Sequence, residues 1–284
     1  AGGRAVKDLF ATDEIFHRVI ATAGEEFGRS TRQLFSSGLA AGLSMSLSFI
    51  GAAALRSQVE GPGGHLIGST LYPLGFLIVV MGRYQLFTEN TLTPVTLVLT
   101  RMASIPLLLR VWSVVFAANV IGAAIAAGFL ATTGVFSDAT ARVGVEMGLD
   151  LVAFGWSALF FKGIIAGWLV ATIVWLTHAV REAAGRILAV WIIVYTIAVA
   201  KLAHCIAGAC EVLFAVFLGE ITWTEFAWGF LTPTTLGNVV GGVLVVALLN
   251  YAQAARELTP GSDYMGPRLS WREWALGRRL SRPD

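Results

Sequence analysis

Six ionisable side chains fall inside long hydrophobic stretches of this sequence, where a charge is expensive and usually serves function. They are Arg83, Glu89, Lys162, Lys201, His204 and Glu211. Apart from the histidine, three are basic and two are acidic. That balance would attract an anion without holding it tightly.

Each of these charged groups also has a purely structural interpretation. Lys201 and Glu211 could form an ion pair, as could Arg83 and Glu89. Lys162 could extend its ammonium group to the membrane interface.

His204 is the strongest candidate for direct chemistry, because it interrupts an apolar stretch among Lys201, Gly208 and Glu211. An imidazole in that position could donate a hydrogen bond to an anion, or pass on a proton as the pH falls. A histidine that only hydrogen-bonds the backbone fits the position equally well, and the sequence leaves both interpretations open.

The composition defines the environment of these residues. Of the 284 residues, 56% are hydrophobic and 13% are charged, whereas about a quarter are charged in a typical soluble domain. Apolar runs of about 20 residues recur, which is the length of a membrane crossing. We therefore expect an all-α membrane protein.

No basic stripe for nucleic acid, no cluster of metal ligands, no cofactor motif and no nucleophile–base pair is visible, so an enzyme is not expected.

Six apolar segments predict six transmembrane helices, which divide the chain into three parts. The spans cover residues 34–55, 66–86, 105–131, 153–178, 187–219 and 235–254. Residues 1–33 form a cytoplasmic amphipathic helix, 34–254 the pore domain and 255–284 a cytoplasmic tail. We expect the second span to be broken at the polar residues 88–91, and the fifth near His204.

The distribution of basic residues predicts the orientation. Arg101, Arg110, Arg181 and Arg186 lie in the loops after the second and fourth spans, on the side of the Arg-rich tail. Because basic loops stay in the cytoplasm, both termini should be cytoplasmic in a bacterial inner membrane.

The two halves of the chain resemble each other. The segment 38–42 matches 163–167, and Asn119-Val-Ile-Gly matches Asn238-Val-Val-Gly, with the two breaks between these matches. Since each half has three spans, the second copy must be inverted, which is a plan typical of transporters and channels. Asn119 and Asn238 would brace the broken segments.

Three motifs together resemble the formate/nitrite transporter family over residues 30–254. They are Leu86-Phe87-Thr88, His204-Cys205-Ile206-Ala207, and the segment 235–242 that contains Gly237-Asn238. The resemblance implies an aquaporin-like protomer with helices 2 and 5 broken, assembled as a homopentamer in the lipid bilayer. It also implies that Leu86 and Phe87 form a constriction, and that Thr88 and His204 face the substrate.

The sequence also departs from that family. Ala203, Gly208 and Gly167 stand where better-known members have polar residues, while Glu89, Asn90 and Lys201 are added. The expected pore set is therefore Leu86, Phe87, Thr88, Glu89, Asn90, Asn119, Lys201, His204 and Asn238.

The expected function is passive or proton-coupled transport of a small monovalent anion, a weak acid like formate or nitrite. One alternative is an aquaporin-like channel for small neutral solutes. Another is a secondary transporter or scaffold subunit whose central ion pairs are structural.

Overall fold

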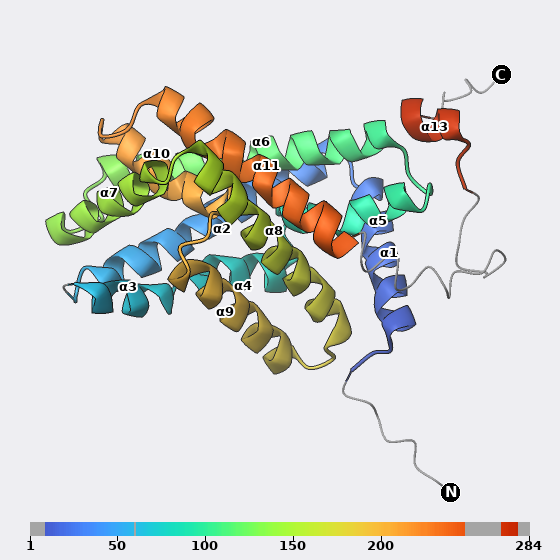
Figure 1. Ribbon diagram of the computed structural model, residues 1–284, viewed down its shortest axis with the longest axis horizontal. Coiled ribbons are helices and arrows are strands. Elements are labelled where there is room, and N and C mark those ends of the chain that lie inside the picture. The colour runs from blue at the N-terminus through green and yellow to red at the C-terminus, as the bar shows by residue number, and fades with distance from the viewer. Residues whose placement is uncertain (1–8, 60, 248–267, 278–284) are drawn as a thin grey trace, which may run out of the picture.

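The structure is a computed structural model that describes residues 9–59, 61–247 and 268–277. These residues form helices joined by short connections (Figure 1). The helices are α1 (Thr12–Gly28), α2 (Thr31–Arg56), α3 (Pro62–Ser69), α4 (Pro73–Gly82), η1 (Glu89–Thr91), α5 (Thr93–Leu99), α6 (Ile105–Thr132), α7 (Asp138–Ala153), α8 (Trp156–Ala179), α9 (Ala183–Val199), α10 (Ala207–Phe217), η2 (Glu225–Leu231), α11 (Thr232–Val240), η3 (Gly241–Ala247) and α13 (Trp271–Leu276).

Four helical stretches of the described chain are long and apolar enough to cross a membrane, namely Thr31–Arg56, Pro62–Gly82, Ile105–Thr132 and Trp156–Ala179. They coincide with the first four predicted spans. The fifth predicted span corresponds to two shorter apolar helices, α9 and α10. The sixth corresponds to α11 and η3, and residues 248–254 of that prediction lie outside the described residues, as do 255–267 and 278–284 of the predicted tail.

Two of the predicted spans are interrupted in the same way. After α4 the chain turns at Arg83, and after α9 it turns at Lys201, both with positive φ (54° and 48°). Each turn ends its helix with a backbone bond that reaches back five residues, from Tyr84 N to Val79 O and from Leu202 N to Ile197 O. An irregular segment follows each turn, and a new helix then begins.

The first break lies earlier in the chain than the sequence predicted. Of the four polar residues expected to form it, 88–91, the last three instead close it with the single turn η1 (Glu89–Thr91), and the irregular backbone runs from Arg83 to Thr88. Three consecutive polar residues are less disruptive than expected because their side chains bond within the loop: Thr91 Oγ1 donates to Thr88 O.

Close packing between helices positions the two breaks. Helix α2 packs against α6, and α8 packs against α11. A Cβ atom at Gly42 would overlap the backbone of Asn119, and one at Gly167 would overlap the backbone of Asn238. Glycine at these two positions therefore brings each asparagine backbone against the neighbouring helix.

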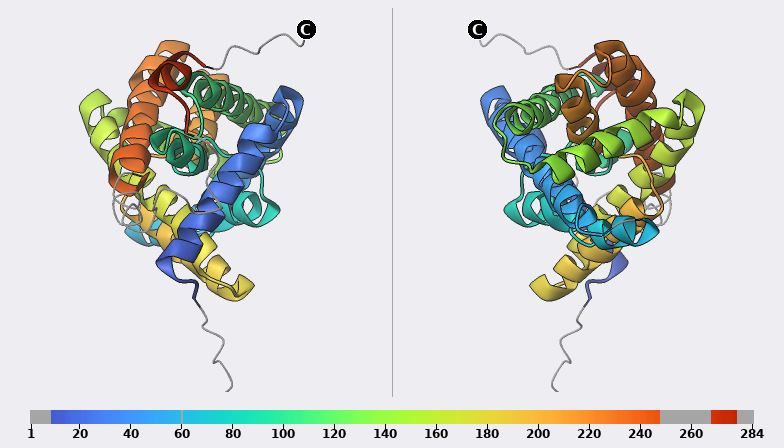
Figure 2. Two further views of the ribbon diagram at one scale, coloured as in Figure 1. Left: turned by 90° about the vertical axis from the view of Figure 1, so that its right-hand side faces the viewer. Right: turned by 90° about the vertical axis from the view of Figure 1, so that its left-hand side faces the viewer.

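Helix α1 lies across one end of the bundle, which we call the α1 side (Figure 2). Phe16, Val19 and Ala23 bury its apolar stripe. Helices α3 and α7 lie at the opposite end, which we call the α7 side (Figure 1). The sequence did not predict α7, because its hydrophobic residues are interspersed with Glu146 and Asp150.

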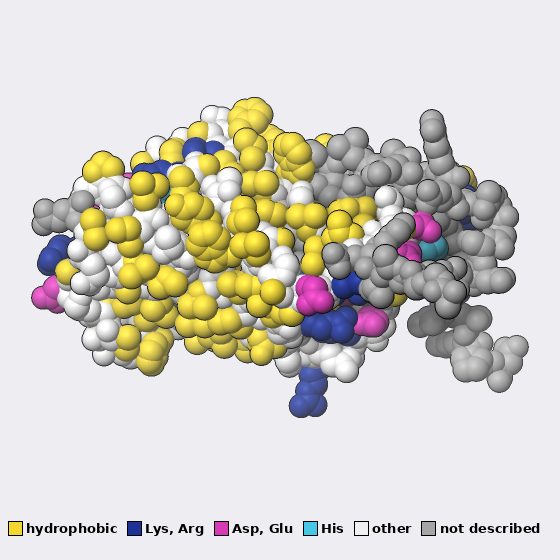
Figure 3. All heavy atoms as spheres, turned by 90° about the horizontal axis from the view of Figure 1, so that it is seen from below, with side chains coloured by type: hydrophobic (Ala, Val, Ile, Leu, Met, Phe, Trp, Pro, Cys, Tyr) yellow, Lys and Arg dark blue, Asp and Glu magenta, His cyan; other side chains and the backbone are white. Residues whose placement is uncertain are grey.

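The outer surface is strongly apolar. Figure 3 shows a broad band of hydrophobic side chains over one face of the bundle, with charged side chains clustered toward its two ends. Large exposed side chains include Ile125, Phe129, Phe161 and Trp168. An apolar band of this kind fits a bilayer core between two polar interfaces.

Candidate functional site

The two interrupted segments meet at the centre of the bundle. Thr88 from the first break and His204 from the second are in contact, with 2.8 Å between Thr88 Oγ1 and His204 Nε2. Both side chains are buried. Residues 116 positions apart in the chain are thus brought together where neither segment is helical.

The other ring nitrogen of His204 determines which way this hydrogen bond runs. The backbone N–H groups of Ile206 and Ala207 donate to His204 Nδ1, at 3.3 and 3.1 Å. Since Nδ1 accepts, the proton of the neutral ring is on Nε2. His204 therefore donates to Thr88 Oγ1, and it also covers the N-terminal end of α10. The interpretation of His204 as a histidine that hydrogen-bonds the backbone is thus confirmed, whereas its role toward an anion stays a prediction.

Two buried asparagines brace the breaks through matching bonds, as the sequence predicted. Asn119 accepts from Phe87 N (2.8 Å) and donates to Gln85 O and Gly38 O. Asn238 accepts from Cys205 N (2.9 Å) and donates to Ala203 O and Gly163 O. Each amide is fully engaged by backbone groups, so these asparagines hold the loops in place.

Apolar and aromatic side chains surround the Thr88–His204 contact. The Phe76 ring lies 5.0 Å from the imidazole in an edge-on arrangement. Phe87 packs edge-on against Phe116 at 5.0 Å and Trp112 at 5.7 Å. Phe76, Leu86 and Phe87 are each at most 4% exposed. We call Phe76, Leu86, Phe87, Thr88 and His204 the central layer.

A cavity of about 100 Å³ lies on the α1 side of this layer. Gln85 and Glu89 of the first break line it, and so does Glu26 of α1. Thr93 Oγ1 donates to Glu26 Oε2 at 2.6 Å. Burial raises the pKa of Glu26 to about 7, although the hydrogen bond from Thr93 and the charge of Arg29 oppose the shift.

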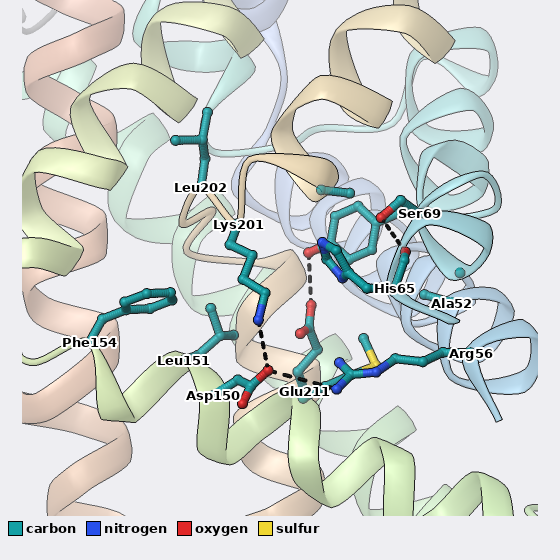
Figure 4. Close-up of a pocket in the computed structure, with 14 residues that line it drawn as sticks. Ala52, Arg56, His65, Ser69, Asp150, Leu151, Phe154, Lys201, Leu202 and Glu211 are labelled. Carbon is teal, nitrogen blue, oxygen red and sulfur yellow. Dashed lines mark hydrogen bonds and ion pairs between the residues drawn. The ribbon is translucent and has the colours of Figure 1, made fainter. Parts of the chain in front are cut away.

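A second cavity, of about 70 Å³, lies on the α7 side (Figure 4). Arg56 and Lys201 reach Asp150 from two directions, at 3.8 and 3.2 Å. Glu211 projects into the same cavity beside them, and Tyr72 donates its hydroxyl to Glu211 Oε1 at 2.7 Å.

One face of α4 connects the two cavities. Tyr72 lines the cavity on the α7 side and Val80 the cavity on the α1 side. Phe76, midway between them, contacts His204. Residues four apart share a helix face, so these three side chains follow one line through the central layer. The sequence analysis missed Tyr72 and Phe76, although their spacing of four along an apolar helix was the available signal.

Comparison with known proteins identifies the family. The sequence profile described as "Formate/nitrite transporter" matches residues 13–252. The chain belongs to the formate/nitrite transporter family. It is 37% identical to the inner membrane protein YfdC of Escherichia coli (strain K12) over 247 residues, which cover 86% of this chain and 79% of that protein. It is 29% identical to a probable formate transporter of Methanothermobacter thermautotrophicus over 208 residues, covering 68% and 76%.

Solved structures agree on the fold of this family member. A structure described as a pentameric formate channel with formate bound superposes with a TM-score of 0.69 and 21% identity, over 79% of this chain and 98% of that one. An FNT family ion channel superposes with a TM-score of 0.72 and 18% identity, over 84% and 98%. At these identities the match establishes the fold.

The structure gives physical reasons for the departures from the formate/nitrite transporter pattern. A Cβ atom at Gly208 would overlap the Phe230 ring, and one at Gly167 would overlap the backbone of Asn238. Ala203 is fully buried, and its carbonyl accepts from Asn238. The polar groups expected from the resemblance are therefore replaced here by tight packing.

Two ion pairs that the sequence left open as alternatives do not form. Lys201 pairs with Asp150 instead of Glu211, because the unpredicted helix α7 places Asp150 beside it. Arg83 lies 3.5 Å from Glu25 of α1 instead of pairing with Glu89.

The expectation for Lys162 also changes. Its ammonium group donates to Lys201 O at 3.0 Å and lies over the Phe154 ring, 4.1 Å from the centroid. It therefore caps the turn at Lys201.

The remaining predicted site residues lie on either side of the central layer. Asn90 is buried, donates to Gln85 Oε1 and accepts from the Trp112 indole at 2.9 Å, so it braces the first break. Glu89 lines the cavity on the α1 side and Lys201 the cavity on the α7 side. The nine predicted residues thus divide among the layer, its braces and the two cavities.

Proposed function

We propose that each protomer carries a small monovalent anion of a weak acid, like formate or nitrite, across the membrane through the central layer. The observation that carries the proposal is the Thr88–His204 contact, which lies between two cavities and within two broken helices. Irregular backbone at membrane depth is tolerated only inside protein or along a water-filled path. The family membership and the formate channels among the relatives and neighbours support the same function.

The central layer combines an apolar barrier with two hydrogen-bond donors. Phe76, Leu86 and Phe87 make the passage costly for a hydrated ion. His204 Nε2–H donates to Thr88 Oγ1, which leaves the Thr88 hydroxyl hydrogen to donate to a permeating anion. Hydrogen bonds in such a chain polarise one another. The backbone N–H groups that donate to Nδ1 therefore strengthen the Nε2–H of His204 and the Thr88 hydroxyl as donors.

His204 acts in this proposal as a hydrogen-bond donor. To become imidazolium it would have to place a proton on Nδ1, where two backbone N–H groups already donate. The neutral ring thus acts on a passing anion through the Thr88 hydroxyl, which can bind the anion briefly and release it.

The proposal includes the finer architecture expected from the sequence. The matching bonds of Asn119 and Asn238, together with the matching turns at Arg83 and Lys201, support two inverted repeats of three spans. The pentameric neighbour supports a homopentamer. The relative in an inner membrane supports that location, with the termini in the cytoplasm as the basic loops predict.

Flux measurements on purified protein in proteoliposomes test this function. Formate, acetate, nitrite, hydrosulfide, bicarbonate and thiocyanate should be compared with urea and glycerol by stopped-flow light scattering. We expect faster flux of at least one weak-acid anion than in protein-free vesicles, and no faster flux of the neutral solutes. The reverse pattern would favour the aquaporin-like alternative.

His204 variants then locate the path. His204→Phe removes the donor, and His204→Asn keeps a shorter one, so flux should be lost in the first and altered in the second. If both variants carried every tested anion like the parent protein, His204 would have no part in transport.

A further inference from the structure

Glu211 is a buried acid next to the proposed pathway. It lies four residues after Ala207, so it projects from the same face of α10 as the residue that donates its N–H to His204. Its side chain lines the cavity on the α7 side and is 5% exposed. Glu211 therefore lies along α10 between the α7-side cavity and the central layer.

The bonding of Glu211 is unusual for a buried acid. Tyr72 donates to Oε1, and among the described residues no cation lies within ion-pair distance of either oxygen. The two nearby cations, Arg56 and Lys201, are both engaged by Asp150. Burying an unpaired carboxylate is costly, whereas a carboxylic acid can be buried at modest cost. The surroundings thus permit Glu211 to hold and release a proton.

The other charged and titratable groups that face Glu211 come from five neighbouring segments that line the cavity. They are Arg56 of α2, His65 of α3, Tyr72 before α4, Asp150 of α7 and Lys201 after α9. The described residues of α6 and η2, which also pack on α10, contribute none to the lining. His65 Nε2 lies 3.3 Å from Val199 O and so is held at the turn after α9.

A weak acid crosses an apolar layer far more easily as a neutral molecule than as an anion, because an ion must be stripped of water. A protein group that the anion meets before the layer can supply this proton. His204 has both nitrogens engaged, whereas Tyr72, bound to Glu211, is the first of the three α4 residues that lead past Phe76.

We propose that Glu211 is the proton-exchange residue of the cavity on the α7 side. It protonates a small carboxylate or similar weak-acid anion that enters this cavity. This inference rests on the proposed function. The O–H bond of the Glu211 carboxylic acid breaks as an O–H bond forms on the anion. The neutral acid moves on, and the Glu211 carboxylate, held by the Tyr72 hydroxyl, takes a proton back from hydronium in the cavity. In the opposite direction Glu211 accepts the proton.

Equilibrium exchange of labelled formate tests this role. Proteoliposomes with the same pH inside and outside, between pH 5 and 8, give a pH profile that does not depend on the orientation of the protein. Glu211→Gln keeps the shape and the acceptor for Tyr72 but carries no exchangeable acid proton. Glu146→Gln is the matched control, because Glu146 is a nearby acid that pairs with Arg56 of the same cavity but lies outside the cavity lining.

We expect Glu211→Gln to slow exchange at pH 7 by about 100-fold, the lower end of the range for lost proton transfer, and to flatten the pH profile. Glu146→Gln should keep the parent profile. A parent-like profile for Glu211→Gln would overturn the role of Glu211 while leaving the proposed function intact. Parent protein that exchanged no formate or other weak acid would overturn both.

A second variant guards against misfolding. If size-exclusion chromatography shows that Glu211→Gln does not assemble, Glu211→Asp takes its place, because it retains an acid on a shorter side chain. We expect it to retain a pH-dependent profile with a reduced rate. A flat profile for an assembled Glu211→Asp protein would overturn the proposal.

Discussion

Thr88 Oγ1 accepts a 2.8 Å hydrogen bond from His204 Nε2, and this contact joins the two interrupted segments of the protein. Each segment is separately fixed by one asparagine, Asn119 or Asn238. The central donors therefore sit on backbone that is held from two helices, α6 and α11. Such bracing gives the precise geometry that hydrogen-bond recognition needs.

Loss of either asparagine should destabilise the protein to a similar degree. Asn119→Ala leaves the buried Phe87 N–H and the Gln85 carbonyl without this partner, and Asn238→Ala does the same to the Cys205 N–H and the Ala203 carbonyl. Each unsatisfied buried group costs about 1–3 kcal/mol. Thermal unfolding in detergent should show a lower Tm for both variants. Thr172→Val, on the exposed side of α8, is the control and should unfold like the parent protein.

Added methyl groups at the close helix contacts should also destabilise the bundle. Gly42→Ala and Gly167→Ala place a Cβ atom against the backbone of Asn119 and Asn238. Overpacking of this kind costs about 1–3 kcal/mol. Gly24→Ala is the matched control, since its Cβ atom meets no neighbour within 4 Å. Equal Tm values for all three variants would show that the helices do not depend on these glycines.

The docking of α1 should weaken as the pH rises. The pKa of Glu26 is raised from 4.5 to about 7 in the folded protein, so the folded state binds more protons than the unfolded state between these values. Stability from this group is complete below about pH 4.5 and is lost as the pH rises through 7, by about 3 kcal/mol at most. The protection factors of the α1 amides, which are corrected for the intrinsic exchange rate, should therefore be lower at pH 8 than at pH 5.

Glu26→Gln tests the cause of this pH dependence. Glutamine cannot ionise but can still accept a hydrogen bond from Thr93, so exchange in α1 should lose most of its change between pH 5 and 8, after correction for the intrinsic rate. A change as large as that of the parent protein would assign the effect to another group.

Much of the fold followed from the sequence because long apolar runs have few structural solutions in a membrane. The first four spans, the interruption near His204 and the bracing by Asn119 and Asn238 were all predicted from composition and internal repetition. The membership in the formate/nitrite transporter family was predicted from three short motifs and is confirmed by the profile match.

Other features depend on tertiary contacts that the sequence does not display. Polar residues in a loop gave no indication that the turn would fall at Arg83, where the backbone adopts positive φ. Helix α7 was not predicted because charged residues are mixed with its hydrophobic ones. The pairing of Asp150 with Lys201 was therefore not predicted either. The residues predicted for the site did not include Tyr72 and Phe76, which the structure places beside Glu211 and His204.

The most direct test of the central claim is labelled-formate exchange through Thr88 variants in proteoliposomes. Thr88→Val keeps the shape of the side chain without its hydroxyl, whereas Thr88→Ser keeps the hydroxyl. If the anion passes the central layer by bonding to Thr88, the valine variant should lose at least about 90% of exchange, equivalent to the roughly 1.4 kcal/mol of one modest hydrogen bond, and the serine variant should retain most of it. Parent-like exchange through Thr88→Val would contradict the account.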